Sequence, residues 1–258
     1  AAERSTVAKK ILEKCDALDG VADGLVQDTK ACQKAFSLAT GVPTCSAARD
    51  GTCLTAAQKS VVADVYAGAK TTAGAAIYSQ FWFDPGIAGD GWAAWKYVNA
   101  IALDPLAAGT VFRTPPAFIS NSLTVSIDEL AASIFATNAT YTEAGMTFMT
   151  PPNAANLPTL KRRGGKMMVY HGVSDPIFSA ADTASWYDQL TNTSNADATN
   201  FARFYLVPGM NHCSGGPSAD QFDMLTPLVN WVEKGIAPDI VVATARGAGN
   251  AGGVNAEV

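Results

Sequence analysis

Two loops in the second half of the chain carry an acid and a base in the order that nucleophilic catalysis uses. Asp175 lies in the segment 171–176 (HGVSDP), and His212 lies in the segment 208–216 (PGMNHCSGG). A neutral imidazole can take the proton of a hydroxyl nucleophile, while a carboxylate holds the imidazole in the right tautomer and stabilises the imidazolium that forms. Asp175 and His212 are therefore the candidate catalytic acid and base.

Each of these residues also has a plainer interpretation when it is taken alone. Asp175 precedes Pro176 and suits a turn, and His212 suits a loop residue whose ring bonds to the backbone. His171 competes as the base, but it stands only four residues before Asp175, directly after an apolar run, which favours a structural role. We favour catalysis for Asp175 and His212 because each follows a predicted buried strand.

The elements that must position these loops are two strands and two helices. Apolar runs at 166–170 and 201–207 predict buried parallel strands. Between them a helix capped by Ser179 is expected, with an apolar face that comprises Ala184, Tyr187 and Leu190. A last helix should stop at Gly235 and Pro238, with an inward stripe that comprises Phe222, Leu225, Leu228, Val229 and Val232. This order predicts the α/β class, with the working residues at the carboxyl ends of the strands.

The chain divides into a first part at 1–160 and a second part at 161–258. The first part is rich in Ala, Thr, Gly and Pro and is expected to be mostly irregular, with turns around 84–86, 114–116 and 150–152. One helix is predicted there, over 55–67, because Thr55 and Gln58 form a capping box.

Composition excludes some classes of function. The chain has 258 residues, is 48% hydrophobic, and has a net charge of −5 from 18 basic and 23 acidic residues. No basic patch stands out, so a nucleic-acid partner is not expected. No apolar run is long enough to span a bilayer, so no membrane association is expected.

The cysteines indicate an oxidising compartment. Four of the five, Cys15, Cys32, Cys45 and Cys53, lie among loop-forming residues at the start of the chain. Such closeness predicts short-range disulfides and a secreted or periplasmic protein, with four free thiols as the alternative. Cys213 is left over and is either buried and free or bonded to something outside the chain.

A nucleophilic serine is missing from the pattern. No serine before Asp175 lies in a Gly-x-Ser-x-Gly turn between a strand and a helix. Ser174 and Ser214 adjoin the acid and the base but lack the two flanking glycines. A serine mechanism therefore needs a further stretch of polypeptide, which would also supply donors to the oxyanion.

The loop around His212 resembles the His-Cys signature of the tannase/feruloyl esterase family, which also includes mono(2-hydroxyethyl) terephthalate hydrolases. The segment 170–175 (YHGVSD) looks like the acid loop of that family, and 222–229 (FDMLTPLV) is similar to the helix after the histidine. The resemblance implies an α/β-hydrolase, of which residues 1–160 are mostly lid and residues 161–258 are the last part of the core. It also implies that Asp175 and His212 are the triad acid and base of a serine esterase that forms an acyl-enzyme.

In that family, a cysteine before the catalytic serine bonds the cysteine after the catalytic histidine. The resemblance implies that the partner of Cys213 lies with the serine, on an N-terminal segment or chain outside this one. The Cys-Ser turn and the C-terminal extension of many members are absent from the sequence, so we expect this chain by itself to be inactive. The alternative is a non-catalytic calcium-binding fragment or pseudoenzyme.

The segment 15–25 (CDALDGVADGL) resembles the calcium loop of the family's lid. The resemblance implies a structural Ca²⁺ with ligands from the carboxylates of Asp16, Asp19 and Asp23 and the backbone carbonyls of Val21 and Leu25. Three carboxylates among small residues suit a hard cation, although the spacing is not that of an EF-hand and a solvated acidic turn is the alternative. It likewise implies the lid disulfides Cys15–Cys32 and Cys45–Cys53.

The resemblance implies esters of aromatic acids as substrates. Trp82, Trp92 and Trp95 would form an apolar cover for the acyl ring, and core packing is the alternative. A terephthalate half-ester would need a cation for its free carboxylate. Arg113, the only arginine of the first part downstream of the tryptophans, does not align clearly with such a cation, so a feruloyl or galloyl ester is preferred and the half-ester stays open.

Overall fold

The computed structural model describes residues 1–46, 48–194, 198–251 and 253–255. The helices of the first part are α1 (Ala2–Cys15), α2 (Thr29–Ala35), α3 (Leu38–Gly41), α4 (Ala56–Ala67), α5 (Asp90–Ala93), α6 (Asn99–Ala102), α7 (Asp104–Thr110), α8 (Ile127–Ser133), α9 (Gly145–Met149) and α10 (Pro158–Arg162). Then follow β1 (Met167–Gly172), α11 (Ala180–Thr193), β2 (Ala202–Val207), β3 (Gln221–Phe222), α12 (Leu225–Lys234) and β4 (Ala243–Thr244). Short 3₁₀ or π turns lie at Asp16–Asp19, Pro85–Ala88, Ala94–Val98, Ser122–Thr124 and Ala198–Asn200.

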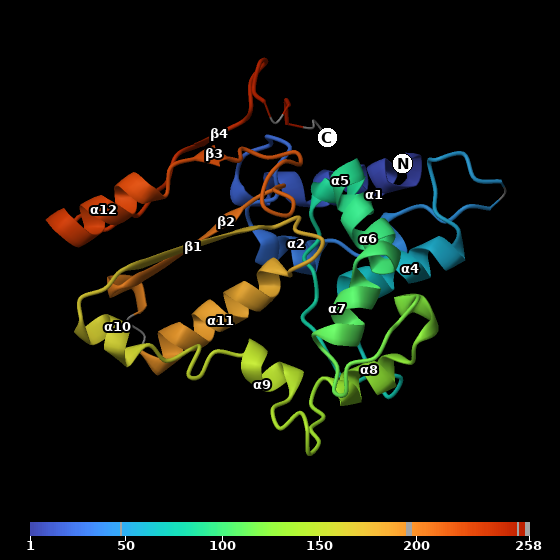
Figure 1. The fold of residues 1–258 in the computed structure, drawn as a ribbon. Coiled ribbons are helices and arrows are strands. Elements are labelled where there is room, and N and C mark those ends of the chain that lie inside the picture. Colours follow the sequence, from blue (N-terminus) through green and yellow to red (C-terminus); the bar gives the residue numbers. More distant parts are fainter. Residues whose placement is uncertain (47, 195–197, 252, 256–258) are drawn as a thin grey trace.

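The predicted parallel strands and the helix between them are confirmed. β1 and β2 run parallel, with Met167 opposite Ala202 and Gly172 opposite Val207. α11 connects the two strands and lies along one face of the pair (Figure 1). Parallel pairing needs such a crossover, and it brings the carboxyl ends of both strands to the same edge.

Local chemistry explains where α11 begins and which face it buries. The Ser179 side chain accepts a hydrogen bond from the Ala181 N–H and caps the helix. Leu190 is fully buried and packs in a cluster with Phe201 and Ala202 at the start of β2. The apolar face expected from the sequence is thus the one that covers the strands.

The prediction for the last helix is partly wrong. α12 ends as expected at Gly235, which is left-handed with φ of 70°, but Phe222 lies in β3 rather than in the helix. Of the expected inward stripe, Leu225, Val229 and Val232 are exposed, at 69%, 39% and 58%, and Leu228 is half-buried, while Trp231 is buried at 3%. An amphipathic stripe specifies a face but not its partner, and within the described residues no element covers this one.

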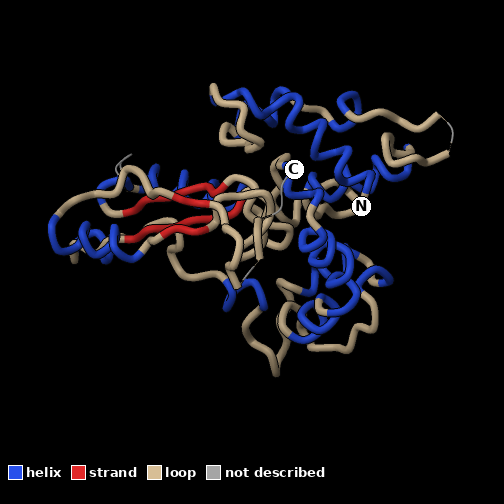
Figure 2. Tube along the Cα trace, turned by 90° about the horizontal axis from the view of Figure 1, so that it is seen from above, coloured by secondary structure: helices blue, strands red, loops and turns tan. Residues whose placement is uncertain are grey.

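Residues 1–162 form a helical part beside the strands (Figure 2). The one helix predicted there is confirmed as α4, with both hydrogen bonds of the Thr55–Gln58 capping box present. Sequence reasoning did not identify α1, although Val7, Ile11 and Cys15 recur at intervals of four and are all buried. Several of the other helices span only four or five residues, which is too short for a hydrophobic period to be visible.

Two disulfides hold the start of the helical part together. Cys15–Cys32 joins the end of α1 to α2, and Cys45–Cys53 closes a shorter loop before α4. A main apolar core surrounds the first of these, and Ile11, Val26 and Leu54 belong to it. No helix in the described part of the chain combines the length and the apolar character needed to cross a membrane.

A small cluster joins the two parts of the molecule. Trp82, from the segment between α4 and α5, packs with Val173 and Ala180, which flank the acid loop. The loop that carries Asp175 is therefore packed directly against the helical part.

Candidate active site

The acid loop leaves β1 in a tight turn. The Asp175 N–H donates to the carbonyl of Gly172, the last residue of the strand, at 3.1 Å. Asp175 Oδ1 then accepts the backbone N–H groups of Ile177 at 2.8 Å and Phe178 at 3.0 Å. These bonds fix the carboxylate and leave its second oxygen for another partner.

The base loop leaves β2 through a glycine that no other residue could replace without strain. Gly209 has a φ of 69°, and a Cβ there would overlap the carbonyl oxygen of Pro217. Further along, the Asn211 N–H donates to the Gly215 carbonyl at 3.0 Å. Asp220 accepts the Gly215 N–H and pairs with Arg246 at 2.6 Å, which anchors the far end of the loop.

The structure brings the predicted acid and base together. His212 Nδ1 lies 2.9 Å from Asp175 Oδ2, with the side chains 21% and 6% exposed respectively. This is hydrogen-bond distance for a carboxylate that holds one tautomer of an imidazole. In the part of the chain that the structure describes, no group hydrogen-bonds to the opposite ring nitrogen, Nε2.

His171 is held by contacts at both ring nitrogens, which fits the structural role expected of it. Its Nδ1 pairs with Thr183 Oγ1 at 2.8 Å and its Nε2 with the Phe178 carbonyl at 2.9 Å. Its Nε2 is 3.6 Å from Asp175 Oδ2, which is too long for a hydrogen bond. Because both ring nitrogens are engaged, His171 is poorly placed to accept a proton from a nucleophile.

Asp175 is held in its ionised form. Burial raises the pKa of this carboxyl, whereas the nearby imidazoles and the N–H groups of Ile177 and Phe178 lower it. The lowering contributions prevail, so the pKa lies below the usual range of aspartate. A charged acid beside the base is what the stabilisation of an imidazolium requires.

Aromatic rings flank the imidazole of His212. The Trp95 ring lies 5.1 Å from it in an edge-on arrangement, and the Phe178 ring lies 5.6 Å from it. Both side chains are partly exposed, at 37% and 56%. Of the three predicted substrate-binding tryptophans, Trp95 lies beside His212. Trp82 and Trp92 are buried in apolar clusters, which agrees with the alternative that they pack in the core.

Sequence reasoning missed Phe178 and Lys96 at this site. Phe178 follows the acid by three residues in the same loop, which was the available signal. Lys96 Nζ donates to the Pro176 carbonyl at 2.9 Å and lies 3.7 Å from the centroid of the Phe81 ring. Burial lowers the pKa of Lys96 to about 8. No local pattern could reveal this contact, because Lys96 and Pro176 are 80 residues apart.

The predicted metal loop folds around its own carboxylates. Asp16 Oδ1 accepts the N–H groups of Asp23 and Gly24, both at 3.0 Å. Asp19 Oδ1 accepts the Val21 N–H at 2.9 Å. Asp23 Oδ1 likewise accepts the N–H of the residue two positions on, at 3.1 Å.

Carboxylate and exposed carbonyl oxygens are the donors that Ca²⁺ takes. The residues that the structure describes nevertheless include no group of three His, Cys, Asp or Glu side chains that converges as a metal site. The donor chemistry of the loop thus suits calcium, while its carboxylates are engaged with their own backbone.

Cys213 differs from the other four cysteines. It is a free, exposed thiol, directly follows His212, and has a φ of 63°, a backbone conformation that few residues other than glycine adopt. Of the five predicted disulfide cysteines, Cys213 alone has no partner among the described residues.

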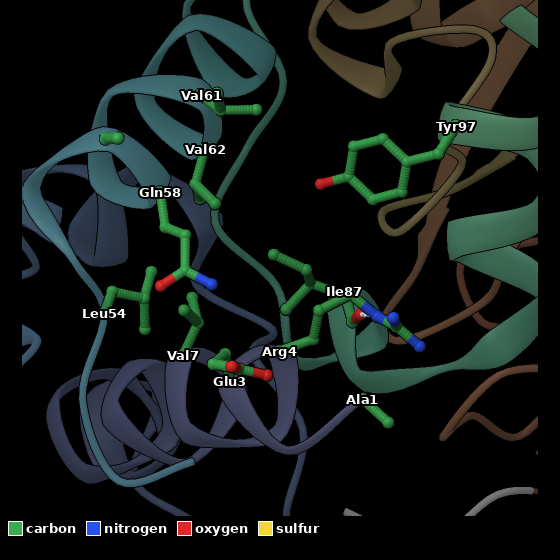
Figure 3. Close-up of a pocket in the computed structure, with 11 residues that line it drawn as sticks. Ala1, Glu3, Arg4, Val7, Leu54, Gln58, Val61, Val62, Ile87 and Tyr97 are labelled. Carbon is green, nitrogen blue, oxygen red and sulfur yellow. Dashed lines mark hydrogen bonds between the residues drawn. The ribbon is translucent and has the colours of Figure 1, made fainter. Parts of the chain in front are cut away.

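A cavity of about 350 Å³ lies elsewhere, in the helical part (Figure 3). Val7, Leu54 and Ile87 contribute apolar walls, and the hydroxyl of Tyr97 points toward it. Neither Asp175 nor His212 lines this cavity.

A family model described as tannase and feruloyl esterase matches residues 1–257. The chain belongs to this family. One relative, a mono(2-hydroxyethyl) terephthalate hydrolase of Piscinibacter sakaiensis, is 37% identical over 272 residues, covering 94% of this chain and 45% of that protein. A probable feruloyl esterase B-1 of Neosartorya fischeri is 27% identical over 268 residues, covering 93% of this chain and 46% of that protein.

Solved structures of this tannase and feruloyl esterase family share the fold. The crystal structure of feruloyl esterase B from Aspergillus oryzae matches with a TM-score of 0.70 and 26% identity, covering 96% of this chain and 50% of that one. Tannin acyl hydrolase from Aspergillus niger matches with a TM-score of 0.62 at 21% identity, covering 94% and 48%. The predicted α/β-hydrolase fold is confirmed, and the chain spans about half the length of the relatives it matches.

Proposed function

We propose that this chain supplies the lid and the acid–base pair of a serine-type carboxylic ester hydrolase. The observation that carries the proposal is the 2.9 Å pairing of His212 Nδ1 with a buried Asp175, beside two aromatic rings, with no partner at Nε2 among the described residues. The substrates are esters of aromatic acids of the feruloyl or galloyl type.

The proposed reaction uses this pair twice. Nε2 of His212 takes the proton of a serine hydroxyl as the oxygen attacks the ester carbonyl, and Asp175 stabilises the imidazolium. The imidazolium then protonates the leaving alcohol, which gives an acyl-enzyme. In the second half, Nε2 takes a proton from water, the resulting hydroxide cleaves the acyl-enzyme, and the proton returns to the serine.

The serine belongs, in this proposal, to polypeptide outside this chain that is linked through Cys213. Cys213 is exposed and adjoins the base, so a disulfide there would hold nucleophile and imidazole together. The exposed stripe of α12, with Leu225 and Val232, offers apolar surface to the same polypeptide. Burial of such apolar surface would stabilise the association of the two polypeptides by about 25 cal/mol per Å² removed from water.

A direct assay tests the division of the triad. This chain alone is expected to show no turnover of methyl ferulate, methyl gallate or a p-nitrophenyl ester, because it lacks the nucleophile. The longer polypeptide that includes it should hydrolyse them. Full turnover by this chain alone would show that the serine lies within it.

Thiol counting under denaturing conditions separates the enzyme from the non-catalytic alternative. In the longer polypeptide Cys213 is expected to be unreactive toward a thiol reagent until reduction, because it is in a disulfide. A free Cys213 thiol there, together with inactivity on all three esters, would favour a calcium-binding fragment or pseudoenzyme.

The acyl ring is proposed to rest against Trp95 and Phe178, whose rings lie 5.1 and 5.6 Å from the imidazole and keep part of their surface exposed. A terephthalate half-ester is the second candidate, favoured by the 37% identity to the mono(2-hydroxyethyl) terephthalate hydrolase. Its free carboxylate would need a cation, and Arg113 already pairs with Glu129 at 2.8 Å. Comparing kcat/KM for methyl ferulate, methyl gallate and the half-ester decides between them.

We further propose that the loop from Asp16 to Leu25 binds a structural Ca²⁺ through the carboxylates of Asp16, Asp19 and Asp23. An ion that binds only the folded chain stabilises it by about 2.7 kcal/mol at a hundred times its Kd. Adding EDTA is therefore expected to lower the Tm, and calcium should restore it.

The variant Asp16→Asn/Asp19→Asn tests whether the loop is responsible. This variant should show the same Tm with and without calcium, whereas Asp64→Asn, an aspartate on α4 outside the loop, should keep the wild-type response. An unchanged Tm of the wild-type chain after chelation would contradict the site. Together with the two disulfides, a calcium site would suit the secreted or periplasmic location that we propose.

A further inference from the structure

A buried carboxylate lies behind the catalytic pair, between the two loops that carry it. Asp84 belongs to the segment between α4 and α5 and is 2% exposed. From the sequence it looks like a turn residue, since Pro85 and Gly86 follow it. Buried carboxylates are rare unless paired or hydrogen-bonded, so the bonds of Asp84 indicate its role.

The two oxygens of Asp84 bond to different catalytic loops. Oδ1 accepts the hydroxyl of Ser174, the residue directly before Asp175 in the acid loop. Oδ2 accepts the backbone N–H of Gly209, three residues before His212 in the base loop, at 3.2 Å. One carboxylate thus joins both loops, and Ser174 and Gly209 are 90 and 125 residues away from it in the sequence.

The backbone around Asp84 packs as closely as its side chain. Asp84 Oδ1 also accepts the Gly86 N–H at 3.0 Å, which fixes the turn. A Cβ at Gly86 would overlap the Ser174 hydroxyl and would lie 3.1 Å from Asn211 Oδ1. The turn therefore touches the residue before the acid and the residue before the base, with no space for a larger side chain.

We propose that Asp84 is a positioning residue that sets the spacing between the acid loop and the base loop. We call Asp84 with Ser174 and Gly209 the Asp84 bridge. This role rests on the proposed function, because that function makes Asp175 and His212 a catalytic pair. The hydrogen bonds of the bridge do not depend on it. The distance that it controls is the 2.9 Å between His212 Nδ1 and Asp175 Oδ2.

The chemistry of the site explains why an aspartate is needed. Three donors, the Ser174 hydroxyl and the N–H groups of Gly86 and Gly209, converge on the carboxylate and offset part of the cost of its burial. Asparagine has nearly the same volume but only one accepting oxygen. Asp84→Asn therefore keeps the packing and places an NH₂ group against a donor in one of the two loops.

The chain offers a spectroscopic test that does not depend on ester hydrolysis. It has two histidines, so ¹⁵N-histidine labelling gives one set of ring signals for His212 and one for His171. The Nδ1–H proton of His212, bonded to Asp175, should resonate far downfield. The hydrogen bonds of His171 run to Thr183 and Phe178 and do not include the Asp84 bridge.

Asp84→Asn is expected to shift or broaden the His212 signal and to leave the His171 signal in place. Ser174→Ala, which removes the acid-loop half of the bridge, should have a smaller effect of the same kind and should add little to Asp84→Asn. Asp90→Asn is the matched control, because Asp90 is six residues on, its side chain is 96% exposed, and among the described residues that side chain pairs with Arg4 rather than with either loop. An unchanged His212 signal, or equal changes at both histidines in the two variants, would overturn the proposal.

In the longer, active polypeptide, Asp84→Asn should lower kcat about a hundredfold with little change in KM, as expected for misplacement of about 1 Å. Asp90→Asn should retain wild-type kcat. A His212 shift in a protein that hydrolyses no ester would uphold the bridge and reject the proposed function. Full kcat with an unshifted His212 signal would reject the bridge alone.

Discussion

Replacing His212 with alanine in the longer, active polypeptide is expected to lower kcat for methyl ferulate by about 10⁴-fold or more. The variant removes the group that takes the serine proton, while oxyanion donors and substrate binding keep a residual rate. Asp175→Asn should have a comparable effect, because an amide that donates toward Nδ1 favours the wrong tautomer. Steady-state kinetics with kcat and KM determined separately measures both.

His171 supplies the sharpest control for this prediction. It stands at the end of the same strand and near the same carboxylate, but both of its ring nitrogens are bonded elsewhere. His171→Gln should therefore cost stability more than turnover. If His171→Gln lost more turnover than His212→Ala, the base would be His171 and not His212. Asp223→Asn, at an exposed carboxylate that accepts the first two N–H groups of α12, should leave kcat unchanged.

Removing the Cys15–Cys32 disulfide is expected to lower the free energy of unfolding by about 3 kcal/mol. The bond closes a loop of 17 residues, and cross-linking such a loop reduces the entropy of the unfolded chain. Both cysteines are also buried in the main core, at 1% and 0% exposure. Urea unfolding of Cys15→Ala/Cys32→Ala, compared with the wild-type chain, measures the change.

The second disulfide is the matched control. Cys45–Cys53 closes a loop of 8 residues, for which the same relation gives about 2.5 kcal/mol. Its cysteines are outside the core, so the double alanine variant loses no packing there. We expect the Cys15/Cys32 variant to have the lower Tm of the two. A Cys45/Cys53 variant that unfolds at the lower temperature would show that burial of the first disulfide contributes little.

Local patterns predicted the parts of the fold that depend on near neighbours in the chain. The capping box at Thr55 and the cap at Ser179 each involve residues within three positions. The apolar runs that became β1 and β2 are continuous in the sequence. The same logic could have predicted α1, but its four buried positions stand among three lysines and other polar residues.

Sequence patterns of this kind do not identify the surface that packs against a predicted helix face. The stripe of α12 shows a helix face with Leu225 and Val232, yet in the described chain this face is exposed. Amphipathicity reflects the free energy of burying a face and carries no record of the surface that buries it. The same limit applies to the three tryptophans predicted at the site, because Trp95 lies beside His212 whereas Trp82 and Trp92 are buried in apolar clusters.

The sequence by itself predicted the two loops that carry Asp175 and His212 and their order along the chain, and it contains no serine in a nucleophile turn before Asp175. These follow from residue type and from position after a predicted strand. Only the tertiary structure decided that both ring nitrogens of His171 are bonded away from the site, that the Phe178 and Trp95 rings lie beside His212, that Lys96 bonds to the acid loop, and that Asp84 joins both loops. Such contacts between distant segments depend on how strands, turns and helices pack together, and a linear pattern of residue types does not encode that packing in any local form.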